Sequence, residues 1–212
     1  MKFHHSTSKG LMLITLISLG TVFILSCNRS GQDQAAPSVE TKTEAASVET
    51  TAPMAADKFA GWLEYGSEPH RFTIMTPKSF VVSRDTTQTA AGDIELVTYL
   101  AELGPAAYGV VCNDFPQDFV AGKDPNAILQ GGSKGFNSQF NGTVTGEQLL
   151  TLNGHSGLEI SLTGATQGVE IFAKGRFYLV GNRMYQIMVI AEKGKEDLEA
   201  IDKFLGSFKL KN

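Results

Sequence analysis

The sequence predicts an α+β domain in which a twisted antiparallel β-sheet is flanked by helices. Runs of alternating or β-branched residues recur between short turns that contain glycine, asparagine or proline, a pattern typical of antiparallel strands. Two further segments have the apolar spacing of amphipathic helices and carry helix start or stop signals. Helices that cover such a sheet bury the apolar side of both elements.

Four strand-like runs come first, over residues 71–76, 80–83, 93–101 and 106–115. Proline at position 77 ends the first run, because proline cannot donate to a strand ladder. In the fourth run, a period of two places Cys112 on the same face as Tyr108 and Val110. No basic residue neighbours Cys112 in sequence, so we expect a buried, inert thiol.

A helix is expected next, with Asp124 as its N-cap and Pro125 at its first position. Four apolar residues then share one helical face: Ile128, Leu129, Phe136 and Phe140. Glycines at positions 131, 132 and 135 oppose this helix, since each costs about 1 kcal/mol relative to alanine.

Strand-like runs return after the Asn-Gly turn at positions 141 and 142. They cover residues 143–152, 158–163, 169–180 and 184–191. The last two runs are separated by Gly181 and Asn182, which predict a two-residue hairpin turn.

The chain is predicted to end with a helix over residues 195–205 and a short edge strand over 208–210. The helix places three apolar residues on one stripe: Leu198, Ile201 and Leu205. Glu199 and Lys203 are spaced to form an ion pair one turn apart, and Gly206 is the stop signal.

Two stretches of the domain resemble the PsbP family of extrinsic photosystem proteins. The first is HRFTIMTPKSFVV at 70–82, in which a phenylalanine and a strand are followed by a proline and a short loop. PsbP proteins usually have Gly-Trp where this chain has Lys78, Ser79 and Phe80. The second, GRFYLVGNRMYQIMVI at 175–190, is followed by a helix and by FLGSFKL at 204–210. The resemblance implies a PsbP-like α/β/α sandwich that serves as a non-enzymatic binding or assembly module.

Residues 1–26 are expected to be a lipoprotein signal peptide. Two lysines precede an uncharged apolar run over 11–25, which as a helix would reach roughly 22 Å, short of the roughly 30 Å hydrocarbon core. The run ends in ILSC, which resembles the bacterial lipobox and implies cleavage before Cys27, then attachment of acyl chains such as palmitate. Two or more chains would anchor the protein stably. The alternatives are a secretory signal cut elsewhere, for example after Gly20, and a short anchor helix.

Residues 27–56 are expected to be the lipidated cysteine and a disordered tether, which leaves 57–212 as a single domain. The stretch 28–56 has no aromatic residue and is rich in Ala, Thr, Ser and Glu, so it cannot bury enough apolar surface to offset the entropy of ordering. Asn28 stands where an aspartate would resemble an inner-membrane retention signal. An extracytoplasmic position is expected, with the outer membrane preferred over the plasma membrane.

The sequence contains a Gly-His-Ser-Gly stretch at 154–157, which raises Ser156 as a candidate nucleophile with His70 or His155 as its base. A nucleophile elbow needs Gly-x-Ser-x-Gly before a helix and a histidine later in the chain. Here position 158 is leucine, a strand pattern follows, and every histidine precedes Ser156. Residues 153–157 are therefore predicted to turn the chain between strands, and no catalytic residue is assigned.

No metal or cofactor site is predicted. Asp114, Asp118 and Asp124 cluster along one segment and could contact Ca²⁺, but their spacing matches no EF-hand, so a solvated acidic loop is preferred. Nucleic acid is not an expected partner, because 18 basic and 22 acidic residues give a net charge of -4 and no basic field.

These observations favour a lipid-anchored, extracytoplasmic, non-enzymatic protein that binds a membrane complex or envelope component. Carriage of a small apolar ligand in a cradle formed by the sheet is the first alternative, and an unrecognised hydrolase is a less favoured one. Because a fold does not determine a function, the first hypothesis depends partly on analogy.

Substitution Cys27→Ala is predicted to release the protein from the membrane fraction, because the acyl chains could no longer attach. Fractionation of cells followed by immunoblotting measures the effect. An unchanged distribution would show that the protein is held at the membrane in another way.

Overall fold

The computed structural model of the chain describes residues 57–89 and 92–211. The predicted signal peptide, Cys27 and the predicted tether lie outside the described residues. The strands are β1 (Leu63–Ser67), β2 (Phe72–Thr76), β3 (Val81–Thr89), β4 (Gly92–Leu103), β5 (Ala106–Asp114), β6 (Thr143–Leu152), β7 (His155–Thr166), β8 (Val169–Val180), β9 (Arg183–Glu192) and β10 (Lys209–Leu210). The helices are α1 (Gln117–Val120), α2 (Pro125–Gln139) and α3 (Leu198–Gly206).

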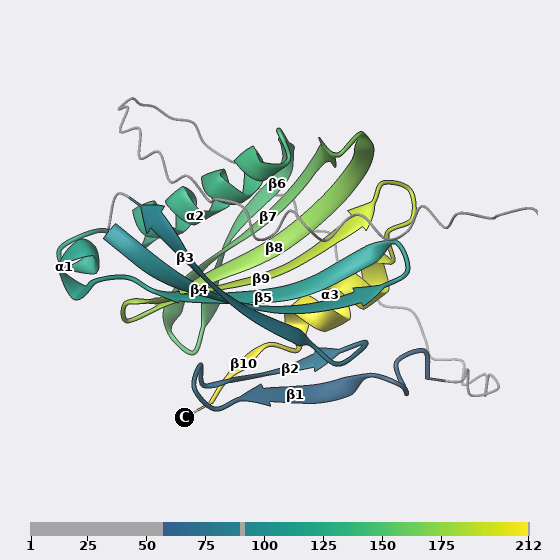
Figure 1. Cartoon of the computed structure of the whole chain (residues 1–212), viewed down its shortest axis with the longest axis horizontal. Helices are drawn as coiled ribbons and strands as arrows, with labels where there is room; N and C mark the ends of the chain where they lie inside the picture. Colours follow the sequence, from purple (N-terminus) through teal and green to yellow (C-terminus); the bar gives the residue numbers. More distant parts are fainter. Residues whose placement is uncertain (1–56, 90–91, 212) are drawn as a thin grey trace, which may run out of the picture.

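The strands form two antiparallel sheets, which confirms the predicted α+β class (Figure 1). The large sheet has the order β3-β4-β5-β9-β8-β7-β6, and the small sheet has the order β1-β2-β10. The sequence predicted a single sheet with residues 208–210 at its edge. Only Lys209 and Leu210 form this strand, β10, and it pairs with β2 and so belongs to the small sheet.

The other elements cover opposite faces of the large sheet. Helix α2 packs on β7 and β8, whereas α3 packs on β8, β9 and β2. Figure 1 shows α2 on one side of the large sheet and α3 with the small sheet on the other. Two apolar clusters result, which we call the α2-side core and the α3-side core.

Strand β9 is buried on both faces. Met184 and Met188 point into the α2-side core, while Tyr185 and Ile187 point into the α3-side core, as expected when alternate residues face opposite sides. A strand covered on both sides needs an almost continuous apolar run, which explains why the sequence predicts it so clearly. The hairpin turn at 181–182 is confirmed, because Val180 pairs directly with Arg183.

Helix α2 begins as predicted. The side chain of Asp124 accepts a hydrogen bond from the backbone N–H of Asn126 at 3.0 Å, and Pro125 is the first helical residue. The glycine at position 132 has a packing reason, since a Cβ there would lie 3.1 Å from Met184 Sδ. Close approach of the helix to the sheet compensates for part of the helical propensity that glycine loses.

Helix α3 begins three residues later than predicted, with Asp197 as its N-cap. Ile201 and Leu205 are buried as expected, but Leu198 is 58% exposed and its predicted burial was wrong. The buried stripe follows Ala200, Ile201, Phe204 and Leu205. Leu198, at the first helical residue, lies to one side of this stripe.

The predicted pairing of Glu199 with Lys203 is not the ion pair that forms. Glu199 Oε2 instead lies 3.0 Å from Lys58 Nζ, and the same ammonium lies 2.8 Å from Asp197 Oδ1. Lys58 therefore ties the start of the described chain to the start of α3. The spacing of residues within the helix could not predict this pair, because Lys58 and Glu199 are 141 residues apart in sequence.

Two elements were not predicted. Strand β1 is exposed along much of its length and contains Gly66, so it lacks a clear alternation of apolar residues. Helix α1 has four residues and no buried one, so it is too short to show helical periodicity. Within residues 57–89 and 92–211, no helix is both long and apolar enough to cross a membrane.

Substitution Gly164→Ala is predicted to destabilise the domain by about 1–3 kcal/mol, because overpacking forces the backbone to move. Strand β7 passes so close to the end of α2 that a Cβ on Gly164 would lie 2.6 Å from the carbonyl oxygen of Phe140. Urea-induced unfolding measures the difference in free energy.

Gly146→Ala is the matched control in the neighbouring strand, where the nearest atom to an added Cβ would be Ser161 Cβ at 3.9 Å. The free energy of unfolding of this variant should change by no more than about 0.5 kcal/mol. Equal losses in both variants would contradict the close-packing explanation.

Candidate functional site

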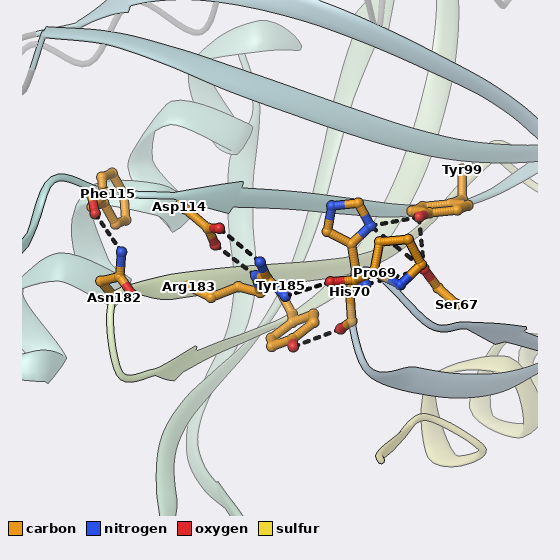
Figure 2. Close-up of polar contacts among 9 residues, drawn as sticks. All are labelled: Ser67, Pro69, His70, Tyr99, Asp114, Phe115, Asn182, Arg183 and Tyr185. Carbon is orange, nitrogen blue, oxygen red and sulfur yellow. Dashed lines mark hydrogen bonds and ion pairs between the residues drawn. The ribbon is translucent and has the colours of Figure 1, made fainter. Parts of the chain in front are cut away.

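A buried polar cluster lies where the turn between β1 and β2 meets the large sheet (Figure 2). The hydroxyl oxygen of Tyr99 is 2.8 Å from Ser67 Oγ and 2.6 Å from His70 Nδ1. Ser67, His70 and Tyr99 are only 3%, 9% and 4% exposed. Residues from three positions along the chain thus share one set of hydrogen bonds.

The local fold of the turn places His70 in this cluster. Ser67 at the end of β1 pairs with Phe72 at the start of β2, and the residues between them close the hairpin. Arg71 adopts a positive φ of 49°, and the backbone N–H of His70 donates to Ser67 Oγ at 3.3 Å. The imidazole is thereby directed at the large sheet.

One assignment of protons satisfies both hydrogen bonds of the Tyr99 hydroxyl. Ser67 donates to the hydroxyl oxygen of Tyr99, and that hydroxyl donates to His70 Nδ1. In this assignment the neutral imidazole carries its proton on Nε2. These hydrogen bonds remove the penalty that unpaired buried hydroxyl groups would cause.

The backbone of the same turn is held by two residues of β9. Tyr185 donates from its hydroxyl to the carbonyl oxygen of His70 at 2.8 Å, and Arg183 Nη1 donates to the carbonyl oxygen of Pro69 at 3.1 Å. Arg183 also forms a bidentate pair with Asp114, at 2.5 Å and 2.7 Å. Figure 2 shows these contacts in one continuous row.

The electrostatic environment keeps the cluster neutral at His70 and charged at Asp114. Burial lowers the pKa of His70, and the positive charges of Arg183 and Arg84 lower it further. Hydrogen bonding to Arg183 lowers the pKa of Asp114. Burial raises the pKa of Tyr99. These shifts favour a fixed ion pair beside a neutral histidine.

This arrangement joins two layers of the protein. The hydroxyls of Ser67 and Tyr99 are enclosed and engaged with His70, so neither is presented to a substrate. Two carbonyl groups of the turn, those of Pro69 and His70, accept hydrogen bonds from β9. The geometry therefore supports a role in docking the small sheet on the large sheet.

The structure does not bring Ser156 together with a base. Ser156 lies in β7, two residues before Leu158, so it faces the α2 side, whereas Tyr99 and Tyr185 of the polar cluster face the α3 side. The large sheet therefore separates Ser156 from His70. His155, adjacent to Ser156 in the strand, points to the opposite face.

The predicted turn at 153–157 is shorter than expected. Only Asn153 and Gly154 lie between β6 and β7, with φ values of 51° and 83°. Ser156 pairs with Thr151, and Gly157 pairs with Leu150, within the sheet. The prediction that these residues are structural agrees with this placement, but the span was wrong.

The three aspartates of the candidate Ca²⁺ loop have separate environments. Asp114 pairs with Arg183, Asp124 caps α2, and Asp118 lies in the first turn of α1. No group of three or more potential metal ligands occurs in the described part of the chain. Asp114 and Asp124 thus have structural partners.

Cys112 lies in the α3-side core and is 1% exposed. It shares this core with Tyr108 and Val110, as the period of two predicted. Burial raises the pKa of its thiol, which disfavours the reactive thiolate.

No protein-family model matches the sequence, and no curated protein matches it. Among solved structures, the solution structure of cyanobacterial PsbP (CyanoP) from Synechocystis sp. PCC 6803 aligns with a TM-score of 0.52 and 10% identity, over 76% of this chain and 98% of that chain. This similarity shows a PsbP-like fold. The crystal structure of PA94 from Pseudomonas aeruginosa, a protein of unknown function, aligns with a TM-score of 0.36 and 9% identity, over 63% and 85% of the two chains.

The free energy of unfolding is predicted to fall as the pH drops below about 6.5, the ordinary pKa of histidine. Because the folded state lowers the pKa of His70, the unfolded chain binds more protons in this range, so stability is present above it and is lost toward acid. One such group gives a slope of at most about 1.4 kcal/mol per pH unit.

Urea unfolding at pH 7.5 and 5.5 tests this, with His70→Asn as the variant, because asparagine retains a polar group near the position of Nδ1 but does not titrate. The difference between the two pH values should shrink in His70→Asn and persist in the control His155→Asn. If the difference shrinks in His155→Asn and persists in His70→Asn, then His70 does not cause the pH dependence of stability.

Proposed function

We propose that this protein is a lipid-anchored, extracytoplasmic, non-enzymatic accessory protein that associates with a membrane complex or another envelope component. The observation that carries the proposal is the PsbP-like fold of the described domain, which aligns with nearly the whole of the cyanobacterial PsbP chain. The resemblance of the sequence to extrinsic photosystem proteins supports an accessory role. The lipobox-like ILSC supplies the anchor in this proposal, through Cys27.

The candidate site supports binding over catalysis. The buried polar cluster of Ser67, His70 and Tyr99 contributes its hydroxyl and imidazole groups to the junction of two layers. Ser156, the candidate nucleophile, lies on the other face of the sheet from His70. A hydrolase mechanism would need these groups to converge on one reacting atom.

The packing does not favour the apolar-ligand alternative. A carrier would need an internal cradle on one face of the sheet, whereas the central strands present large, fully buried side chains to both cores. These include Leu158, Ile160 and Phe177 on the α2 side and Ile187 on the α3 side. The space beside the central strands is therefore filled by the protein's own side chains.

A partner is predicted to co-purify with the anchored form of the protein. Mild crosslinking of intact cells, affinity purification from detergent-solubilised membranes and mass spectrometry would identify it. One recurrent membrane or envelope protein should be captured with the wild type and strongly depleted with Cys27→Ala, because the anchor brings the two together.

Ser156→Ala is the matched control and should capture the same partner in the same amount. Failure to capture any recurrent partner with either the wild type or Ser156→Ala would contradict the accessory role. Capture that is equal with and without Cys27 would retain the binding function and refute the anchor.

A further inference from the structure

We propose that the outer edge of β3 is a docking surface that binds an extended strand of a partner protein. The favoured strand carries an acidic residue opposite Arg84 and apolar residues opposite Val81 and Val82. This inference rests on the proposed binding function and adds the surface and the chemistry of the partner segment.

Strand β3 is a regular edge. It forms nine consecutive antiparallel pairs with β4, from Val81–Leu100 to Thr89–Gly92, without a register shift. It is the last strand of the large sheet on its side, and no other described strand pairs with its outer edge. Its sequence, VVSRDTTQT, contains neither proline nor glycine. Alternate N–H and C=O groups of such a strand point outward and can pair with an added strand.

The other edge of the large sheet differs in this respect. Strand β6 contains a register shift between Val144 and Gly146, which marks a β-bulge or irregularity. Bulges at sheet edges interrupt the row of outward-facing groups and discourage strand addition. The contrast singles out β3 as the edge that can accept a long strand.

The exposed side chains at the start of β3 are apolar. Val81 is 73% exposed and Val82 is 46% exposed. The preceding Phe80 packs on Tyr65 and Tyr99, with ring centroids 5.0 Å and 6.0 Å apart, so this end of the strand is fixed beside the small sheet. In Figure 1 the start of β3 lies near β2. A partner strand that pairs here would cover both valines, and this end of β3 already has a fixed conformation.

A second copy of this chain fits the edge less well than a different strand. In a twofold antiparallel pair, residues at equal distance from the axis face each other. An axis at Arg84 or Asp85 sets a charge against its own copy, which is unfavourable. An axis at Ser83 or earlier leaves much of the strand unpaired, and an axis at Thr86 or later leaves both valines outside the overlap. A different strand can complement Val81, Val82 and both charged residues in one register.

Charge defines the partner chemistry. The side chain of Arg84 is 56% exposed, and its Nη1 lies 3.3 Å from the exposed Glu95, a pairing too weak to prevent a second carboxylate from binding. Asp85 follows on the other face of the strand, where a basic residue is the complement. An antiparallel partner therefore places a basic residue opposite Asp85 and an acidic residue opposite Arg84. Any residue fits opposite Ser83, and two apolar residues follow opposite positions 82 and 81.

The probe is the synthetic peptide Thr-Thr-Val-Thr-Lys-Glu-Thr-Val-Val, and its control exchanges Lys and Glu without changing composition. Fluorescence anisotropy with the full-length protein in detergent should give at least about fivefold tighter binding for the first peptide, from two complementary cross-strand pairs. Hydrogen exchange should slow in β3 when this peptide binds.

The double variant Arg84→Glu, Asp85→Lys changes exposed or half-buried side chains and should reverse the preference between the two peptides. Equal binding of both peptides, no binding at millimolar concentration, or protection in β6 in place of β3 would overturn the proposal. Concentration-dependent dimers in analytical ultracentrifugation that the double variant abolishes would overturn it in favour of a second copy. If neither peptide binds at β3 but a partner is still captured from cells, this proposal fails and the proposed function stands.

Discussion

The burial of β9 on both faces is the constraint on which the rest of the structure depends. Each fully buried apolar side chain of this strand contributes about 1.5–3 kcal/mol, and because the side chains alternate between the two faces, each face needs its own cover. Helix α2 covers one face, and α3 with the small sheet covers the other. The small sheet is therefore part of the core, even though it shares no backbone pairing with the large sheet.

This arrangement explains the chemistry of the candidate site. Aromatic contacts provide much of the apolar junction, with Phe72 5.2 Å from Tyr99 and 5.5 Å from Phe208 between ring centroids. Docking the small sheet also buries polar groups of its hairpin turn, and these must be paired. Tyr99, Tyr185 and Arg183 of the large sheet supply the partners. The most triad-like group of residues in the domain is thus explained by the packing of layers.

The sequence predicted the parts of the fold that follow from local patterns. A nearly continuous apolar run identified β9, and the Asp-Pro pair identified the start of α2, because both signals depend on neighbouring residues. Strand β1 was missed because its mostly exposed residues show no alternation of apolar and polar side chains. The polar cluster was also missed, since Ser67 and Tyr99 are 32 residues apart and Tyr185 reaches a carbonyl 115 residues away. Turn geometry decides those contacts, and the chain shows no local signal for them.

A sheet with a filled centre leaves its edges as the places where backbone groups can still form new hydrogen bonds. Soluble proteins usually protect such edges, because an open strand attracts unintended partners. Here one edge is irregular at Val144 and Gly146, whereas the other keeps nine regular pairs and exposes two valines. If protection from unintended pairing were the only requirement, irregularities at both edges would meet it. Regularity on only one edge is the asymmetry expected of a binding module in which a single strand is kept open for a partner.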